Sequence, residues 1–331
     1  MAIDILNVKP HVVSRDLTGY SILLYGEPKT GKTTISSMFP NSLLLGFEKG
    51  YSAIPGIMAQ PVNTWGEFMQ VIRQLKKDEV KEVYKNIIID TADIAWDYCQ
   101  KYILDNQGVD KVSDVPYGQG YGMIEKEFDT EVRKIVQYGY GLILISHDQD
   151  KTFTSEQGEE YNKIVPSLEK RALKVVSRLT DIIGYVRNLE NRETGETKVK
   201  MFLRGTPRYM AGSRFKYMVS SIDMGYENLV NALHDAIEEE AKANNNKFIS
   251  DDKNEAHKDT STELDFDTLM EEFNSLIQEF AKDEEKMSTY YAPRIQEIIE
   301  RYIGKGNKVT NMSRTQTEAL DLIVADLKEL D

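Results

Sequence analysis

A loop of small residues between an apolar run and a helical pattern is the feature that most constrains this chain. The apolar run at 22–25 is followed by Gly-Glu-Pro-Lys-Thr-Gly-Lys-Thr at 26–33, which fits the pattern G-x-x-x-x-G-K-[ST]. Glycines let such a loop wrap closely, so that successive backbone N–H groups point inward at an anion. The helix that follows directs its positive end at the same place. The sequence therefore predicts a phosphate-binding loop, with a nucleoside triphosphate such as ATP as its ligand.

Two side chains of this loop have separate predicted roles. Lys32 is expected to reach the β- and γ-phosphates, and the Thr33 hydroxyl is expected to hold Mg²⁺. A chance glycine-rich turn is the alternative, but a strand before the loop and a helix after it are what the motif requires. The predicted nucleotide-binding residues are Gly26, Glu27, Pro28, Lys29, Thr30, Gly31, Lys32, Thr33 and Thr34.

An acidic residue ends the apolar run Asn-Ile-Ile-Ile-Asp at 86–90. A carboxylate at the end of a buried strand, next to the phosphate loop, is suited to bind Mg²⁺ through water. The alternative is that Asp90, with Asp93, only caps the next helix. Because the phosphate loop is also present, we favour a magnesium site formed by Thr33 and Asp90.

Short apolar runs alternate with amphipathic stretches between residues 20 and 240. Strands are expected at 21–25, 42–47, 86–90, 141–146, 182–190 and 198–205. Helices are expected at 32–39, 65–77, 92–104 and 123–138. This alternation indicates an α/β fold with a mostly parallel sheet and crossover helices. The last two strands, joined by a polar turn with Gly195, are expected to form an antiparallel hairpin at the sheet edge.

Composition changes after residue 240. Residues 1–240 are predicted to form the nucleotide-binding core, 241–262 a flexible polar linker, and 263–331 a small acidic helical domain. Ser313 and Gln316 have the spacing of a capping box within that domain. We expect the helical domain to recruit a protein partner, for instance a single-strand-binding protein or a nuclease.

Charge and composition exclude several classes of protein. The formal net charge of −13 argues against a protein that coats nucleic acid with its whole surface, although it leaves room for a local basic groove. The chain has no apolar run of membrane-spanning length, no pattern of a signal peptide at its N-terminus and a single cysteine, Cys99. These features predict a cytoplasmic protein that does not contact a membrane.

Hydrolysis of a bound triphosphate needs a group that positions a water molecule for in-line attack. Glu48 lies just past the second predicted strand, and the carboxyl ends of parallel strands share one edge of a sheet with the phosphate loop. A solvated glutamate paired with Lys49 is the alternative. His147 follows the fourth strand at the same edge, where a polar side chain could contact the γ-phosphate, although a lone His is more often structural.

The order of these parts resembles the RecA-type ATPase core over residues 20–235. The resemblance implies that Glu48 activates the water and that His147 senses the γ-phosphate. It also implies that a basic residue near 205–215 reaches the nucleotide of a neighbouring subunit; the candidates are Arg204, Arg208, Arg214 and Lys216.

More narrowly, the chain resembles phage-encoded RecA-like nucleotide-binding proteins, some of which act in single-strand annealing or recombination. The segments that carry this resemblance are GEPKTGKTT at 26–34, GTPRYMAGSRF at 205–215 and IDMGYENLVNALHDAIEE at 222–239. The resemblance implies a homo-oligomeric ring or filament in the host cytoplasm. Unlike bacterial RecA, the chain carries no N-terminal helical oligomerisation domain.

Two segments of RecA-like cores hold single-stranded DNA, and here they correspond to 105–122 and 148–166. We expect both segments to be long loops. In the first, Lys111 could contact a phosphate, while Tyr117 and Tyr121 offer ring faces for base stacking. Lys151 is the candidate in the second loop, whose acidic residues weaken the case for DNA. An ordinary surface loop is the alternative for both.

Two other classes of function remain open. A metabolic P-loop kinase would need a mobile arginine-bearing lid, and no such segment is evident between the predicted strands. A nucleotide-gated interaction module would bind ATP without appreciable turnover.

Overall fold

The computed structural model describes residues 6, 10–190, 194–245, 247–252 and 265–330. Two compact units divide the chain, and the boundary between them falls between residues 259 and 260. None of the helices in these described ranges combines the length and the apolar character that crossing a membrane requires.

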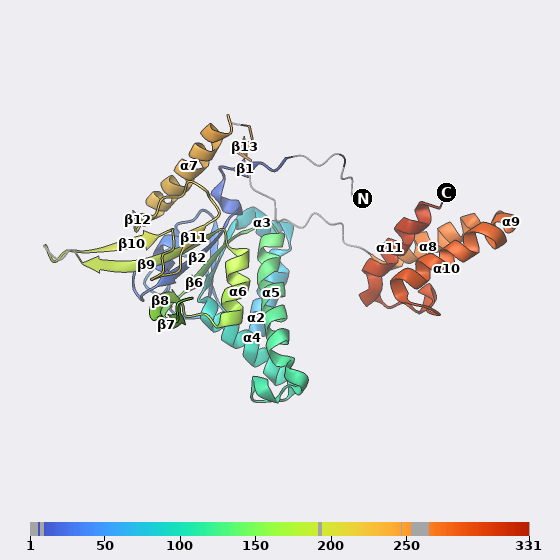
Figure 1. The fold of residues 1–331 in the computed structure, drawn as a ribbon, viewed down its shortest axis with the longest axis horizontal. Helices are drawn as coiled ribbons and strands as arrows, with labels where there is room; N and C mark the ends of the chain where they lie inside the picture. The colour runs from blue at the N-terminus through green and yellow to red at the C-terminus, as the bar shows by residue number, and fades with distance from the viewer. Residues whose placement is uncertain (1–5, 7–9, 191–193, 246, 253–264, 331) are drawn as a thin grey trace. The chain divides into compact units, whose positions relative to one another are not determined.

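A central sheet of nine strands organises the first unit (Figure 1). The order across the sheet is β12 (Ser221–Asp223), β10 (Thr197–Phe202), β9 (Ile182–Glu190), β2 (Ser21–Gly26), β6 (Gly141–Ser146), β5 (Asn86–Asp90), β3 (Ser42–Gly46) and β4 (Ala59–Pro61), with β11 (Gly212–Ser213) paired to β9. From β9 to β4 all neighbouring strands run parallel, whereas β10, β11 and β12 pair antiparallel at one side. The α/β fold with a mostly parallel sheet and the antiparallel β9–β10 hairpin are confirmed.

Helices cover both faces of this sheet. The first face carries α2 (Trp65–Leu75), α4 (Ala92–Gln107), α5 (Gly120–Gln137) and α6 (Lys170–Leu179), and the second carries α1 (Lys32–Ser37) and α7 (Tyr226–Ala243). A short helix, α3 (Asp78–Val83), precedes β5.

Alternation along the strands explains why their sequences are apolar throughout. In β2, Leu23 packs into the core under α2, α4 and α5, while Ile22 and Leu24 pack into the core under α1 and α7. Successive side chains of a strand point to opposite faces, so a strand covered on both sides has no polar face. Each fully buried aliphatic side chain contributes roughly 1.5–3 kcal/mol to the free energy of unfolding.

The expectation of a long loop at 148–166 is wrong. These residues form an antiparallel hairpin of β7 (Asp148–Thr154) and β8 (Glu160–Pro166), outside the central sheet. Because most side chains of β7 are exposed, the segment lacks the apolar pattern that identifies the central strands. The segment 105–122 is also shorter as a loop than expected, since α4 extends to Gln107 and α5 begins at Gly120.

The flexible linker expected at 241–262 is wrong for the residues that the structure describes there. Helix α7 continues to Ala243, and β13 (Ile249–Ser250) pairs in parallel with β1 (Val13–Ser14). Arg15 further joins this pair through ion pairs with Glu238 and Asp251, at 2.5 and 3.0 Å. Residues 253–264 of the expected linker lie outside the described residues.

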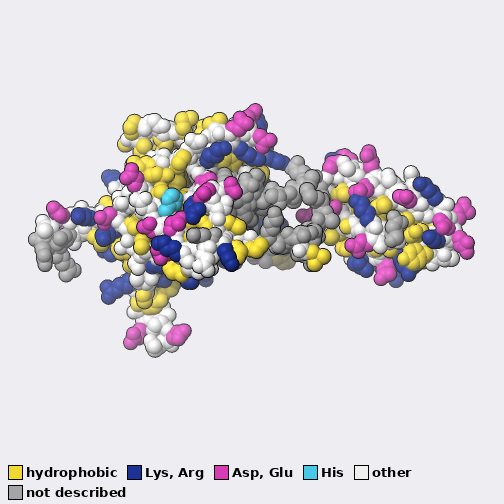
Figure 2. All heavy atoms as spheres, turned by 90° about the horizontal axis from the view of Figure 1, so that it is seen from above, with side chains coloured by type: hydrophobic (Ala, Val, Ile, Leu, Met, Phe, Trp, Pro, Cys, Tyr) yellow, Lys and Arg dark blue, Asp and Glu magenta, His cyan; other side chains and the backbone are white. Residues whose placement is uncertain are grey.

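The second unit is helical, as expected. The elements are α8 (Phe266–Phe280), α9 (Glu284–Lys286), the π-helical turn η5 (Met287–Tyr291), α10 (Ala292–Ile303) and α11 (Thr317–Lys328). The core combines Leu269 and Phe273 of α8 with Ile295 of α10 and Leu320 and Ile323 of α11. The capping box of Ser313 and Gln316 is confirmed. On the face that Figure 2 shows, acidic and basic side chains of this unit lie intermingled.

Candidate nucleotide-binding site

The loop between β2 and α1 has the conformation that its glycines allow. Gly26 has a φ of 147°, and a Cβ atom there would lie 1.9 Å from the carbonyl oxygen of Val186. Gly31, with a φ of 87°, caps the N-terminus of α1. No other residue fits at position 26 without moving β9, which explains the first glycine of the motif in this chain.

Lys32 is buried inside the loop. Its Nζ donates to the carbonyl oxygens of Gly26 and Glu27, each at 2.7 Å, and burial lowers its pKa. The ammonium is thus already placed among the loop's backbone groups. A phosphate oxygen entering the loop could replace these carbonyls as its partner.

Thr33 and Asp90 contact each other directly. The Thr33 hydroxyl donates to Asp90 Oδ2 at 2.8 Å, and Asp90 is only 1% exposed. Burial raises the pKa of Asp90 to about 6, although the hydrogen bond from Thr33 opposes this shift. The other carboxylate oxygen, Oδ1, is buried without a hydrogen-bond partner.

This donor set fits a magnesium ion held jointly with a nucleotide. Within the described ranges, no cluster of three or more His, Cys, Asp or Glu side chains is arranged to hold a metal by itself. Mg²⁺ typically takes one or two carboxylates together with substrate phosphates and water. A hydroxyl and an unpartnered carboxylate oxygen beside a phosphate loop suit that mode of binding.

Glu48 and His147 lie at the same edge of the sheet. His147 Nε2 is 3.7 Å from Glu48 Oε2, so Glu48 is directed toward His147. A Cβ atom built on Gly50 would meet Glu48 Oε1 at 3.4 Å, Asp90 Oδ2 at 3.5 Å and Thr33 Oγ1 at 3.7 Å. The structure therefore brings the carboxylates of Glu48 and Asp90 and the hydroxyl of Thr33 around one point.

A hydrogen-bonded cluster behind this site was not foreseen from the sequence. Asp93 Oδ1 accepts from Ser146 Oγ at 3.1 Å and from Ser167 Oγ at 2.5 Å. Ser146 and Ser167 flank the β7–β8 hairpin, and the backbone N–H of Ser167 donates to the carbonyl of His147 at 2.9 Å. Asp93 thus joins the first turn of α4, three residues after Asp90, to both ends of the hairpin. Its spacing from Asp90 was the available signal, but that spacing suggested only a helix cap.

Tyr25 makes a second link to the hairpin. This buried residue precedes Gly26, and its hydroxyl donates to the carbonyl of Met210 and, at 3.3 Å, to that of Ile164 in β8. A polar role for Tyr25 could not be expected from the sequence, because Tyr25 lies in an apolar strand.

The DNA-contact candidates lie on separate elements. Lys111 and Tyr117 lie on the α4–α5 connection, Tyr121 lies in the first turn of α5, and Lys151 lies on the exposed face of β7. Tyr117 is 96% exposed, whereas Tyr121 is 46% exposed and packs against Arg171. The ring of Tyr117 is therefore open to solvent, whereas the ring of Tyr121 is open in part and is approached by the Arg171 guanidinium.

The basic residues near 205–215 differ in their surroundings. Arg204 donates to the carbonyls of Phe215, Lys216 and Met218, so it holds its own segment in place. Arg214 pairs with Asp181 at 3.0 Å. Arg208 and Lys216 are exposed.

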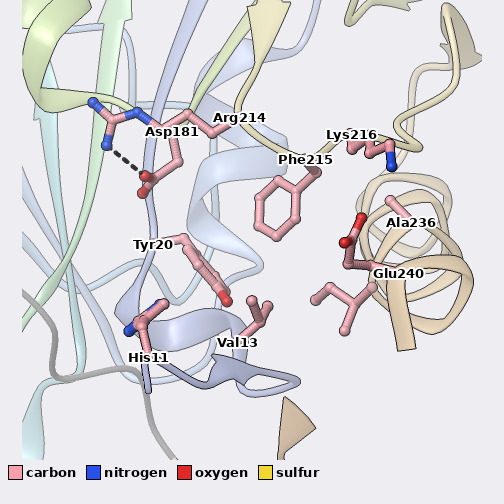
Figure 3. Close-up of a pocket in the computed structure, with 10 residues that line it drawn as sticks. His11, Val13, Tyr20, Asp181, Arg214, Phe215, Lys216, Ala236 and Glu240 are labelled. Atoms are coloured by element: carbon pink, nitrogen blue, oxygen red, sulfur yellow. Dashed lines mark hydrogen bonds and ion pairs between the residues drawn. The ribbon is translucent and has the colours of Figure 1, made fainter. Parts of the chain in front are cut away.

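Arg214 and Lys216 line a cavity of about 570 Å³, together with Tyr20, Phe215 and Glu240 (Figure 3). Tyr20 and Asp181 directly precede β2 and β9, so this cavity lies at the amino edge of the sheet, opposite the phosphate loop. The sequence offered no signal for this cavity, because its walls come from five separated segments.

Comparison with known proteins identifies a family and a relative of this chain. A family model described as an AAA domain, AAA_24, matches residues 18–215. The SPbeta prophage-derived uncharacterized protein YorG of Bacillus subtilis (strain 168) is 32% identical over 341 aligned residues, covering 100% of this chain and 99% of YorG. The KaiC-like protein PH0186 from Pyrococcus horikoshii OT3 has a crystal structure with a TM-score of 0.34 and 12% identity, over 57% of this chain and 80% of that one. With its phosphate loop at the carboxyl edge of a parallel sheet, the chain belongs to the AAA_24 family of P-loop NTPase domains.

Proposed function

We propose that this protein hydrolyses ATP with the help of Mg²⁺ and that Glu48 orients the attacking water. The observation that carries this proposal is the convergence of Glu48, Asp90 and Thr33 within 3.7 Å of one point beside the phosphate loop. Phosphoryl transfer depends mainly on positioning and on electrostatic stabilisation, so an acid at this location supports the assignment of Glu48 as the residue that would orient the water.

Each residue of the site would have a separate role in hydrolysis. Lys32 would exchange its backbone carbonyl partners for the β- and γ-phosphate oxygens. Thr33 and Asp90 would hold Mg²⁺, which supplies neutralisation of the phosphate charge when bound. Glu48 would accept a hydrogen bond from the water, and His147, 3.7 Å from Glu48, would contact the γ-phosphate.

We further propose that the nucleotide state controls binding of single-stranded DNA in phage recombination, annealing or repair. Asp93 and Tyr25 each join the nucleotide site to the β7–β8 hairpin, which supports a hairpin that responds to the γ-phosphate. The prophage origin of YorG agrees with a phage context. Lys111, Tyr117, Tyr121 and Lys151 are then the first candidates for DNA contacts.

Oligomer formation belongs to the same proposal. A ring or filament would let exposed Arg208 or Lys216 reach the nucleotide of a neighbour, whereas Arg214 would first have to leave Asp181. The helical unit at 265–330 would recruit a single-strand-binding protein or a nuclease.

The test compares Glu48→Gln with Glu82→Gln. Glu82 is an exposed residue of α3, which precedes the amino end of β5, so its substitution makes the same chemical change away from the point of convergence. We expect Glu48→Gln to lower the rate of phosphate release by about 100-fold or more while ATP binding is kept, and Glu82→Gln to change it little. Equal rates for wild type and Glu48→Gln would overturn the assignment, and ATP binding without turnover in the wild type would support a nucleotide-gated interaction module instead.

A further inference from the structure

Helix α6 presents a row of basic side chains to solvent. Its buried residues, Ala172, Val175, Val176 and Leu179, face the core. Arg171, Lys174 and Arg178 follow one another at i, i+3 and i+7, so they lie on one face of the helix. Their side chains are 41%, 60% and 54% exposed. We call these three residues the basic stripe.

All three cations of the basic stripe converge on a single carboxylate. Glu125, on the neighbouring helix α5, lies 3.0 Å from Arg171, 2.9 Å from Lys174 and 3.7 Å from Arg178. One carboxylate neutralises one of three charges, and a guanidinium alone carries five N–H donors. Arg178 Nε also donates to the carbonyl of Lys174 at 3.2 Å, but the three side chains remain 41%, 60% and 54% exposed, so the stripe keeps N–H donors open to a further ligand. In a chain whose net charge is −13, this surplus of positive charge is a local exception.

An aromatic ring lies at one end of the stripe. Tyr121 is on α5, one helical turn before Glu125, and the guanidinium carbon of Arg171 is 5.2 Å from its ring centroid. Tyr121 is 46% exposed. A ring face beside a row of cations is the combination with which proteins bind unpaired bases and their phosphates.

We propose that the basic stripe and Tyr121 form a binding surface for single-stranded nucleic acid. Phosphates would take the free donors of the stripe, and an unpaired base would stack on Tyr121. This inference rests on the nucleic-acid part of the proposed function and names helix α6, rather than the β7–β8 hairpin, as the main contact. The hairpin carries Lys151 but also Glu159 and Glu160, so its charge suits phosphates less well.

The chemistry of the surface favours a single strand over other polyanions. A duplex offers phosphates but hides the faces of its bases, so Tyr121 would add nothing to its affinity. An anionic membrane or an acidic protein would likewise use the cations alone. Sensitivity to Tyr121 therefore separates a single strand from these alternatives.

The experiment measures the fluorescence anisotropy of a labelled oligothymidylate at several salt concentrations. We expect the triple variant Arg171→Gln, Lys174→Gln, Arg178→Gln to bind about tenfold or more weakly. The slope of log affinity against log salt should fall by about 2, because each phosphate contact to a single strand contributes roughly 0.7. Tyr121→Leu should weaken binding roughly tenfold, with little change in the slope.

Two controls make the result specific. The first control is the triple variant Lys81→Gln, Lys101→Gln, Lys242→Gln. It removes the same total charge from three lysine side chains that each pair with one carboxylate elsewhere on the first unit, so it should bind the oligonucleotide like the wild type. Glu125→Gln removes the competing carboxylate, so it should bind the oligonucleotide more tightly. A purely structural role of Glu125 would give no such gain.

Several outcomes would overturn the inference. The first is equal oligonucleotide affinity of the stripe variant and the control triple variant. The second is an affinity for a duplex that equals the affinity for a single strand and does not change in Tyr121→Leu. The third is binding to anionic vesicles but not to the oligonucleotide. ATP hydrolysis measured without oligonucleotide in the same preparations separates the two proposals. Wild-type binding of the oligonucleotide that the stripe variant retains in full removes this surface alone, and hydrolysis without any oligonucleotide binding by the wild type removes the nucleic-acid part of the proposed function as well. Stripe-dependent binding with Glu48→Gln fully active removes the hydrolytic mechanism alone.

Discussion

Burial of the Asp90 carboxylate lowers the stability of the folded chain near neutral pH. The carboxylate is buried, and its pKa of about 6 exceeds the ordinary value of 3.8. The folded chain therefore holds the proton of Asp90 more tightly than the unfolded chain does. This tighter proton binding adds to the free energy of unfolding. The contribution is fully present below pH 3.8 and is lost as the pH rises through about 6.

Asp90→Asn should therefore stabilise the metal-free and nucleotide-free protein at pH 7.5. The shift of roughly two pKa units corresponds to about 3 kcal/mol at most, so we expect a gain of about 1–3 kcal/mol in the free energy of unfolding. Near pH 4 the gain should be much smaller, because the wild-type carboxyl is then protonated in the folded state. Urea unfolding in the presence of a chelator measures both values, and an equal gain at both pH values would contradict this account.

The residues of the site differ in how far their positions could be predicted from the sequence. The phosphate loop has fixed residue types at fixed spacing, and Glu48 and His147 follow strands whose carboxyl ends share an edge, so their proximity could be inferred. Asp93 and Tyr25 could not be assigned in this way, because their partners, Ser167 and Met210, are far away in sequence. Only the folded arrangement of the hairpin brings them together.

At the scale of elements, the β7–β8 hairpin is the clearest difference between expectation and structure. Strands buried on both faces gave an unmistakable apolar pattern, and all six expected central strands are present. The hairpin is exposed on most of its length, so its stability depends on backbone pairing and on a few tethers rather than on apolar periodicity. The tether at its base is Ser167, which donates to both Asp93 and, through its backbone, His147.

Ser167→Ala should loosen the base of the hairpin without disturbing the phosphate loop. We expect hydrogen exchange over 148–166 to become faster and the difference between ADP-bound and ATP-analogue-bound protein to shrink, while nucleotide affinity stays within about twofold. Thr152→Ala is the matched control, because it removes the hydrogen bond to Asn162 at 3.1 Å within the hairpin and leaves its base intact. If the backbone amides of 148–166 exchanged at the same rate in both variants, Asp93 would not couple the nucleotide site to the hairpin.

At the scale of the whole molecule, the first unit does not end where composition changes. The polar residues after 240 suggested a linker, yet α7 continues to Ala243 and Ile249–Ser250 pairs with Val13–Ser14. The chain therefore uses a polar segment to complete its nucleotide-binding unit. Composition could not reveal this pairing, because a two-residue strand leaves almost no pattern.

A chain that ends after residue 252 should be more stable than one that ends after residue 240. The longer form keeps β13 and the ion pair between Arg15 and Asp251, whereas the shorter form exposes β1 and loses the last turn of α7. We expect a difference in melting temperature of several degrees, with ATP hydrolysis kept by the longer form. Equal melting temperatures would show that the β1–β13 pair contributes nothing.

The hydroxyl of Tyr25 offers a spectroscopic reporter of this molecule's working cycle. It is bound at once to the carbonyls of Ile164 and Met210, one residue before the phosphate loop begins. A fluorine atom introduced on this ring would place a single NMR signal where three distant stretches of backbone meet. Its chemical shift would then distinguish empty, ADP-bound and ATP-bound protein without any label on the surface.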